Sequence, residues 1–232
     1  MNKLKKCAVI ICLTISVVSA IVMALSLKEE AVQSKELEVI AQKAQNYVQE
    51  IKNPYTELKK EYPDLTAYIQ TDDISLPVMN SDEYLYKNID GDKTELGIPF
   101  SLNTPQDSNF IIYGHSTVYN DESYFTPLLK LKDQEYYEKH DKIIIYSSLG
   151  ISQYAITNVY LLSNDQFDEY DYQVYNFTDK EEFVKFMEFP NTNNLIESIN
   201  GEIDFSDKFI TLQTCNDFIG NEKLIIIARK II

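Results

Sequence analysis

Two neighbouring stretches, Phe209-Ile-Thr-Leu-Gln-Thr-Cys215 and Lys223-Leu-Ile-Ile-Ile-Ala-Arg229, decide the fold of this chain. Each is an apolar run of strand length, and a short polar segment joins them, so they predict a pair of β-strands. Side chains alternate along a strand, which places Gln213 and Cys215 on one face together with Phe209 and Thr211. Cys215 is therefore expected on the more polar face, at the lip of its strand.

A histidine ends another apolar run. The stretch Asn109-Phe-Ile-Ile-Tyr-Gly-His115 predicts a third strand with His115 at its end. A cysteine and a histidine at strand ends are the parts of a thiol acyl-transfer site. The plainer alternatives are an inert cysteine and a surface or hydrogen-bonding histidine. His140, between Lys139 and Asp141, is expected to be solvated, so His115 is the better functional candidate.

The rest of the chain predicts short strands with a few helices. At 232 residues it can hold one good-sized core with an appendage. Strands are expected at 66–70, 74–79, 97–102, 142–147 and 151–162, and helices at 29–52, 54–60, 121–129 and 178–188. Because helices do not alternate with strands, the pattern favours a mainly β fold, a closed or nearly closed barrel with peripheral helices.

The N-terminus predicts a membrane anchor. Residues 7–27 carry no charge and follow three lysines, and an apolar run of about 20 residues can span a bilayer. A cleaved signal peptide is the alternative. The expected organisation is a cytoplasmic tail (1–6), a transmembrane signal anchor (7–27), an N-terminal helical segment (28–62) and a main domain (63–232) outside the cell.

The net charge and the cysteine count limit the classes of partner and cofactor that we expect. A formal net charge of −15 repels nucleic acid and anionic lipid, and it suits a cationic or amine-bearing partner, although solubility alone also explains it. With two histidines there is no Cys/His cluster of metal spacing, so neither metal nor cofactor is expected. Cys7 and Cys12 lie within the apolar run, which leaves Cys215 unpaired and either reactive or buried.

Two of these motifs resemble the signatures of a known protein family. Thr211-Leu-Gln-Thr-Cys215 resembles the Thr-Leu-x-Thr-Cys signature of sortases, and Ile111-Ile-Tyr-Gly-His115 resembles their histidine strand. The two-part N-terminal helical region and the helix before the cysteine strand are similar to class B members. The resemblance implies a closed eight-stranded β-barrel and a single-pass membrane enzyme of a Gram-positive cell, with its catalytic domain facing the cell wall and no cofactor.

The resemblance also implies a reaction. Cys215 would attack the carbonyl after a threonine in the C-terminal sorting signal of a surface protein, giving a thioacyl-enzyme that is transferred to a cell-wall peptidoglycan amine. His115 would protonate the departing amine and deprotonate the incoming one. Class B members suggest an Asn-Pro-x-Thr or Ser-Pro-x-Thr motif. The candidate substrate contacts are Tyr172, Gln213 and Thr214, with a packed surface role as the alternative for Tyr172; class B members often have serine in place of Gln213.

The sequence differs from the sortase pattern at one position, because sortases have an arginine at the start of the last strand. Lys223 occupies that position, while Arg229 lies near the far end. If 216–222 is the loop, antiparallel pairing puts Cys215 opposite Lys223 and Arg229 about 20 Å from the sulfur. A tighter turn at 220–221 would bring Arg229 nearer, and we favour Lys223.

Lysine lacks the planar fork of arginine, so a bidentate grip on substrate would be lost. The alternative function is therefore a sorting-peptide-binding protein with weak or no catalysis. A third option is an unrelated thiol peptidase that hydrolyses the thioacyl intermediate.

Overall fold

The computed structural model describes residues 3–49, 53–117, 124–167, 169–216 and 221–232, and it divides into two compact units, Met1–Glu38 and Val39–Ile232. The first unit belongs to one long helix, α1 (Lys3–Gln49), whose last turns lie in the second unit. Those turns bury Ile40 and Ala44, and Lys43 pairs with Glu61 at 2.7 Å. The predicted helix from residue 29 is confirmed through Gln49, and residues 50–52 lie outside the described part.

The predicted single-pass topology is wrong. Within the described residues, no helix is long and apolar enough to cross a membrane. A cytoplasmic tail at 1–6, an anchor over 7–27 and an extracellular placement of the rest therefore have no support from the structure.

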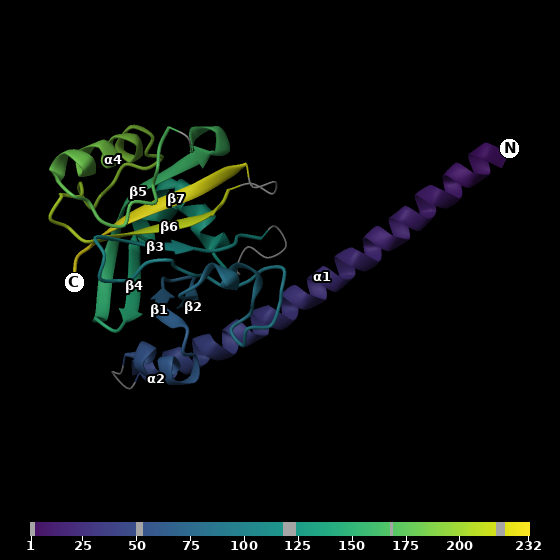
Figure 1. Ribbon diagram of the computed structural model, residues 1–232, viewed down its shortest axis with the longest axis horizontal. Helices are drawn as coiled ribbons and strands as arrows, with labels where there is room; N and C mark the ends of the chain where they lie inside the picture. The colour runs from purple at the N-terminus through teal and green to yellow at the C-terminus, as the bar shows by residue number, and fades with distance from the viewer. Residues whose placement is uncertain (1–2, 50–52, 118–123, 168, 217–220) are drawn as a thin grey trace. The chain divides into compact units, whose positions relative to one another are not determined.

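The second unit is built on one sheet. Its strands are β1 (Leu65–Gln70), β2 (Ser75–Met79), β3 (Asn109–Tyr113), β4 (Lys142–Ser147), β5 (Gly150–Ser163), β6 (Phe209–Cys215) and β7 (Glu222–Lys230). Among the described residues the order is β2-β1-β4-β5-β7-β6-β3 (Figure 1), and every neighbouring pair is antiparallel except β3 and β6. The mainly β prediction is confirmed. Pro77 lies in β2, at an edge of the sheet, where a residue without an N–H is tolerated.

The expected eighth strand is reduced to one residue. The stretch 97–102 forms no strand, but Phe100 bridges Met79 at the end of β2 and Tyr113 at the end of β3. The Phe100 and Tyr113 backbones exchange hydrogen bonds of 3.0 and 2.8 Å, and their rings stack at 5.2 Å. The two edge strands of the seven-stranded sheet are thus linked through Phe100. Pro99 lacks a backbone N–H, and this limits the pairing available to the segment.

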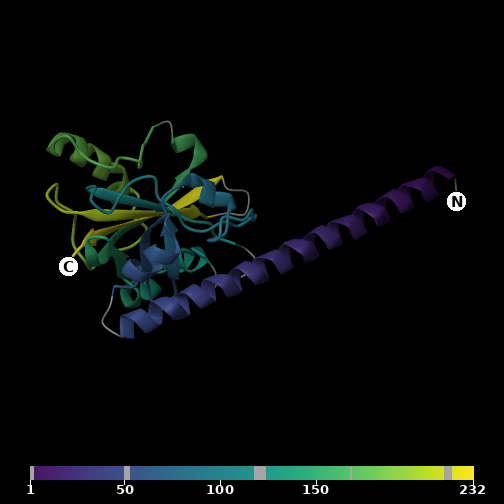
Figure 2. The same cartoon turned by 60° about the horizontal axis from the view of Figure 1, so that its bottom comes forward.

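Helices flank the sheet at its two ends. Within the second unit, the described helices that follow the last turns of α1 are α2 (Pro54–Glu61), α3 (Gln134–Lys139) and α4 (Lys180–Thr192), with 3₁₀ turns η1 (Asp82–Tyr86), η2 (Thr126–Lys132) and η3 (Asn164–Gln166). Figures 1 and 2 place α2 beside β1 and β4 and α4 at the opposite end of the sheet. The predicted helix at 121–129 appears as η2, and residues 121–123 lie outside the described part.

The sequence explains where these helices begin. The Asn53 side chain accepts the Tyr55 N–H at 3.0 Å, directly before Pro54. The Asp179 side chain accepts the Glu182 N–H at 2.9 Å and caps the start of α4. Phe183 and Phe186 of α4 then pack with Phe177 and with Phe209 of β6. This aromatic cluster fixes the beginning of the strand that ends at Cys215.

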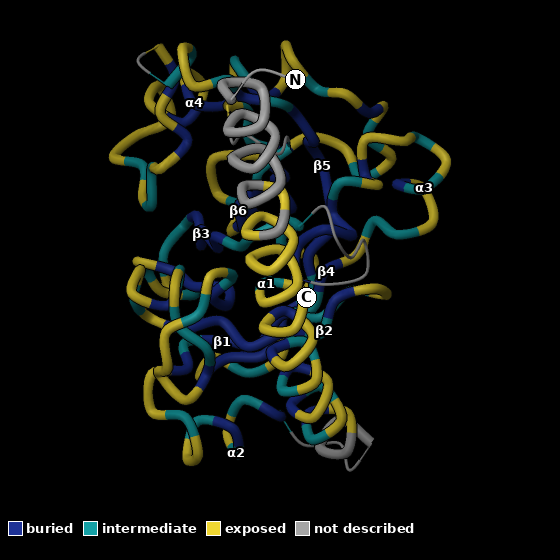
Figure 3. The backbone as a smooth tube through the Cα atoms, turned by 90° about the vertical axis from the view of Figure 1, so that its right-hand side faces the viewer, coloured by how far each residue is buried: buried dark blue, intermediate teal, exposed yellow. Residues whose placement is uncertain are grey.

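The strands of the sheet supply most of the buried core. The buried residues follow the sheet in Figure 3, and the central residues of β7, from Leu224 to Ala228, have no exposed surface. Strands buried on both faces carry continuous apolar runs, which is why β7 reads as Leu-Ile-Ile-Ile-Ala. The strands predicted at 142–147 and 151–162 are confirmed as the hairpin of β4 and β5, in which Gly150 begins β5 at φ +101. The functional boundaries at 28–62 and 63–232 stay predictions.

Candidate active site

The predicted register of the last hairpin is confirmed. Cys215 pairs with Lys223 and Phe209 pairs with Arg229 across β6 and β7. The Lys223 ammonium donates a hydrogen bond to the Cys215 sulfur, with 3.3 Å between Nζ and Sγ. The thiol is half-buried and makes no disulfide. A cation therefore lies directly against the candidate nucleophile.

Arg229 serves another part of the molecule. Its guanidinium donates to the carbonyls of Glu202 at 3.0 Å and Asn200 at 2.7 Å, in the segment between α4 and β6. The tighter turn that would have moved Arg229 towards the sulfur does not occur, since the pairing of β6 and β7 runs without a shift from Phe209 to Cys215. Lys223 is the basic side chain at the thiol.

The histidine reaches the same end of the sheet along β3. Strands β3 and β6 run parallel, with Tyr113 beside Gln213, and the Gly114 N–H continues the ladder to the Gln213 carbonyl at 3.0 Å. Because the offset is constant along a parallel pair, His115 follows β3 at the same level at which Cys215 ends β6. Figure 1 shows β3 and β6 side by side.

The imidazole of His115 is held by a backbone carbonyl. Nε2 donates to the Leu85 oxygen at 3.0 Å, and the Tyr86 ring lies 6.2 Å away. A carbonyl can only accept, so Nε2 carries the hydrogen and Nδ1 is left as the basic nitrogen of the neutral ring. Burial lowers the pKa of His115 below its ordinary value, the Leu85 hydrogen bond opposes this, and the charge of Lys223 lowers the pKa further.

Two glycines allow this placement. Gly97 has φ +49, and a Cβ built on it would lie 2.2 Å from the Leu85 oxygen, so only glycine fits against the carbonyl that holds the histidine. A Cβ on Gly114 would lie 2.6 Å from the Phe125 ring. The Phe125 N–H in turn donates to the His115 carbonyl at 2.9 Å. The histidine is thus fixed through its side chain, its carbonyl and the residue before it.

The candidate substrate contacts separate into two groups. Gln213 is half-buried on the Cys215 face, and its Oε1 accepts the Tyr172 hydroxyl at 2.5 Å. Tyr172 is 3% exposed, and burial raises its pKa. Thr214 lies on the other face of β6 with no exposed surface, and within the described residues its hydroxyl has no hydrogen-bond partner. The structure brings Tyr172 and Gln213 together beside Cys215 and turns the Thr214 side chain inward.

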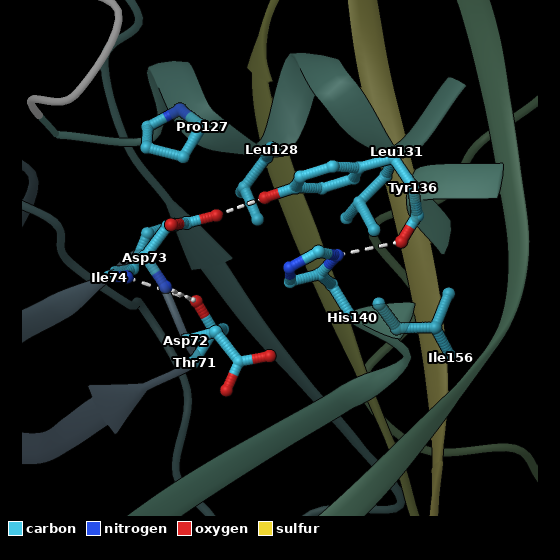
Figure 4. Close-up of a pocket in the computed structure, with 10 residues that line it drawn as sticks. All are labelled: Thr71, Asp72, Asp73, Ile74, Pro127, Leu128, Leu131, Tyr136, His140 and Ile156. Carbon is cyan, nitrogen blue, oxygen red and sulfur yellow. Dashed lines mark hydrogen bonds between the residues drawn. The ribbon is translucent and has the colours of Figure 1, made fainter. Parts of the chain in front are cut away.

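His140 is not solvated as expected. Its ring stacks on Tyr136 with centroids 4.0 Å apart, and its Nδ1 donates to the Tyr136 carbonyl at 2.8 Å (Figure 4). The Tyr136 hydroxyl donates to Asp73, tying α3 to the turn between β1 and β2. The small pocket in Figure 4 lies between this turn and η2, and Leu128 and Leu131 line it. These contacts indicate that His140 has a structural role.

Sequence reasoning missed the residues that support His115 and Cys215. The Leu85 carbonyl belongs to the backbone, and a backbone group has no residue-type signal. Ser116, whose hydroxyl donates to the Cys215 carbonyl at 2.6 Å, directly follows the histidine and gave the one usable signal, a polar residue at the end of an apolar strand. In the described part of the chain, no group of three or more His, Cys, Asp or Glu side chains is placed to hold a metal ion.

Comparison with known proteins identifies the family and agrees with the fold. The family model described as the sortase domain matches residues 71–231, most of the chain. The chain belongs to the sortase family. No curated protein matches the sequence.

Solved sortase B structures share the fold. Staphylococcus aureus sortase B in a substrate complex matches with a TM-score of 0.76 at 21% identity, covering 88% of this chain and 98% of that one. Sortase B from Clostridium perfringens matches at 0.74 and 20%, covering 86% and 98%. Sortase B from B. anthracis matches at 0.74 and 20%, covering 88% and 99%. The chain is therefore a sortase with a class B-like fold.

Proposed function

We propose that this sortase is a cysteine transpeptidase that cleaves a C-terminal sorting signal after a threonine and joins the new C-terminus to a cell-wall amine. Family membership and fold support a cell-wall sorting transpeptidase with sorting-signal substrates and amine acceptors. One observation carries the finer proposal. The Lys223 ammonium contacts the Cys215 sulfur, on a strand whose parallel neighbour leads into His115.

The proposed reaction begins with a proton transfer. The lowered pKa keeps His115 neutral near pH 7, and Nδ1 takes the thiol proton of Cys215 because Nε2 keeps its hydrogen on Leu85. The sulfur attacks the carbonyl after threonine, and Lys223 donates to the developing oxyanion. As the C–N bond breaks, imidazolium His115 gives its proton to the leaving amine. A thioacyl-enzyme and a neutral histidine remain.

The second half of the reaction returns the proton. The incoming amine attacks the thioester and loses a proton to His115, which passes it to the departing sulfur of Cys215. The new amide forms and the enzyme is restored. The net charge of −15 favours the approach of a cationic amine acceptor. Within this scheme the substrate contacts are Gln213, Tyr172 and the backbone around Thr214, and 63–232 is the functional unit preceded by the helical segment 28–62.

The test uses the full chain with sorting-signal peptides. Peptides of the Asn-Pro-x-Thr and Ser-Pro-x-Thr types are incubated with and without an amine acceptor, and the protein is analysed by mass spectrometry. We expect a thioacyl adduct on Cys215 and a transpeptidation product with the amine. Cys215→Ala is the control and should form neither. Absence of both adduct and cleavage with every peptide would contradict the proposal.

A second candidate is a sorting-peptide-binding protein with weak or no catalysis. It is favoured by Lys223, which gives a charge but not the bidentate grip of arginine, while Arg229 is engaged with Glu202 and Asn200. Lys223→Arg separates the two functions. A large gain in turnover indicates chemistry that lysine limits, whereas unchanged turnover with measurable peptide binding favours the binder. Release of hydrolysed product in the presence of amine would instead indicate a thiol peptidase.

A further inference from the structure

The contact between Ser116 and Cys215 lies where the parallel ladder stops. Strands β3 and β6 pair regularly up to Tyr113 and Gln213, and Gly114 adds one more hydrogen bond. A continued parallel ladder would next place the backbone N–H of residue 116 on the Cys215 carbonyl. At this position the Ser116 hydroxyl donates to that carbonyl, with 2.6 Å between Oγ and O.

We propose that Ser116 is a positioning residue that sets the separation between the His115 imidazole and the Cys215 sulfur by tying the end of the histidine strand to the cysteine backbone. The proposal rests on the transpeptidase function proposed above and adds a residue to that site. Ser116 touches no reacting atom in the scheme. It acts through the two residues that do, one of which is its sequence neighbour and the other its hydrogen-bond acceptor.

The tether has a distinct role among the contacts of His115. The hydrogen bonds to Leu85 and from Phe125 hold the histidine to its own side of the site, and neither involves β6. The Ser116 bond crosses to β6 at the residue that carries the thiol. Its O–H···O distance is at the short end of the usual range, and Ser116 is half-buried, so competition from water is reduced.

Geometry of this kind affects the chemical step more than substrate binding. A misplacement of about 1 Å between reacting groups can cost about 100-fold in rate, while groups that only bind substrate change KM. A serine that merely ends a strand would affect stability alone. The two roles can therefore be separated by the kcat and KM of suitable variants, and by a probe of the imidazole that needs no turnover.

The matched variants are Ser116→Thr and Ser116→Val in the full chain, because the two new side chains have the same shape and differ in the hydroxyl. Ser147→Ala is the control. The Ser147 hydroxyl also bonds to the backbone, where it accepts the Leu149 N–H at the turn between β4 and β5. Comparing Ser116→Thr with Ser116→Val isolates the effect of the hydroxyl even if both variants lose some stability. Thermal unfolding measures that loss of stability.

The turnover-independent probe is the NMR titration of the imidazoles. The chain has two histidines, so His140 supplies the second signal, and His140→Gln assigns it. The charged group that acts on His115 is Lys223, with Cys215 beside it. Releasing the tether should admit water to the imidazole and move the His115 midpoint up towards its ordinary value of 6.5.

The expected result is a kcat about tenfold or more below wild type for Ser116→Val, with KM changed less than about twofold, and near-wild-type kinetics for Ser116→Thr. The His115 midpoint should rise in the valine variant, stay in the threonine variant and stay in Ser147→Ala. Equal kinetics and equal midpoints for the valine and threonine variants would overturn the tether. If wild type turns over no peptide, the proposed function fails, and the titration alone decides the tether.

Discussion

At the scale of single residues, the composition of the site depends on which polar side chains already make hydrogen bonds in other parts of the protein. Arg229 and Lys223 share a strand, yet the arginine binds the carbonyls of Glu202 and Asn200 while the lysine meets the thiol. The sequence favoured Lys223, because with 216–222 as the loop the rise per residue places Lys223 opposite Cys215, but it did not predict the carbonyls that Arg229 binds. The Leu85 carbonyl could not be predicted, since any residue type offers one.

The buried histidine should make stability depend on pH. Its folded pKa is lowered, so on acidification below about 6.5 the unfolded chain takes up a proton at His115 before the folded protein does. Protonation then favours the unfolded state, and stability falls with pH until the folded site also protonates. We expect the free energy of unfolding to drop between pH 7 and pH 5 by more in wild type than in His115→Asn, as measured by urea denaturation.

The comparison isolates His115 because the other titrating groups are common to both proteins. His140 is present in each, and carboxyl groups with lowered pKa values, such as Asp107, lose their contribution at more acidic pH. Parallel pH profiles for wild type and His115→Asn would show that the imidazole is not shielded as the structure has it.

At the scale of elements, local pairings were predictable and the distant one was not. The hairpin of β6 and β7 and that of β4 and β5 follow from apolar runs separated by short turns. The parallel pair of β3 and β6 joins segments about 100 residues apart, and the sequence offers no register for such a pair. This unpredicted pair is what brings His115 to Cys215, helped by the ring of Phe125 in the space that a side chain at Gly114 would fill.

That close approach leads to a double-mutant cycle. Gly114→Ala places a methyl group 2.6 Å from the Phe125 ring, and overpacking of this kind costs about 1–3 kcal/mol. It should also lower kcat, because the shift occurs next to His115. Phe125→Leu makes room, so the double variant should be more stable than the sum of the single effects, with a coupling of about 0.5–3 kcal/mol. Urea denaturation of the four proteins measures it, and simple additivity would contradict the contact.

At the scale of the whole sheet, its two edges are linked by very few backbone hydrogen bonds. The sequence predicted a full strand at 97–102, whereas Phe100 alone bridges β2 and β3. Asn103 supports the same edge, since its side chain donates to the Asn109 carbonyl at 2.7 Å and accepts the Ile111 N–H at 3.0 Å. The Asn103 side chain thus makes the hydrogen bonds to β3 that the backbone of a neighbouring strand would otherwise make. Residue-type patterns give no sign of such a substitution, and this is why the strand count was overestimated.

Removing the Phe100 ring should therefore weaken both the fold and the site. Phe100 is 6% exposed and stacks on Tyr113, two residues before His115. Phe100→Ala is expected to cost about 3–5 kcal/mol in unfolding free energy, as for other buried aromatic residues. Leu102→Ala, on the same segment but 51% exposed, is the control and should cost less than about 0.5 kcal/mol. Because β3 loses support on the side away from β6, the His115 midpoint should also rise in Phe100→Ala. A destabilised protein with an unchanged midpoint would mean that β6 alone holds the histidine strand in place.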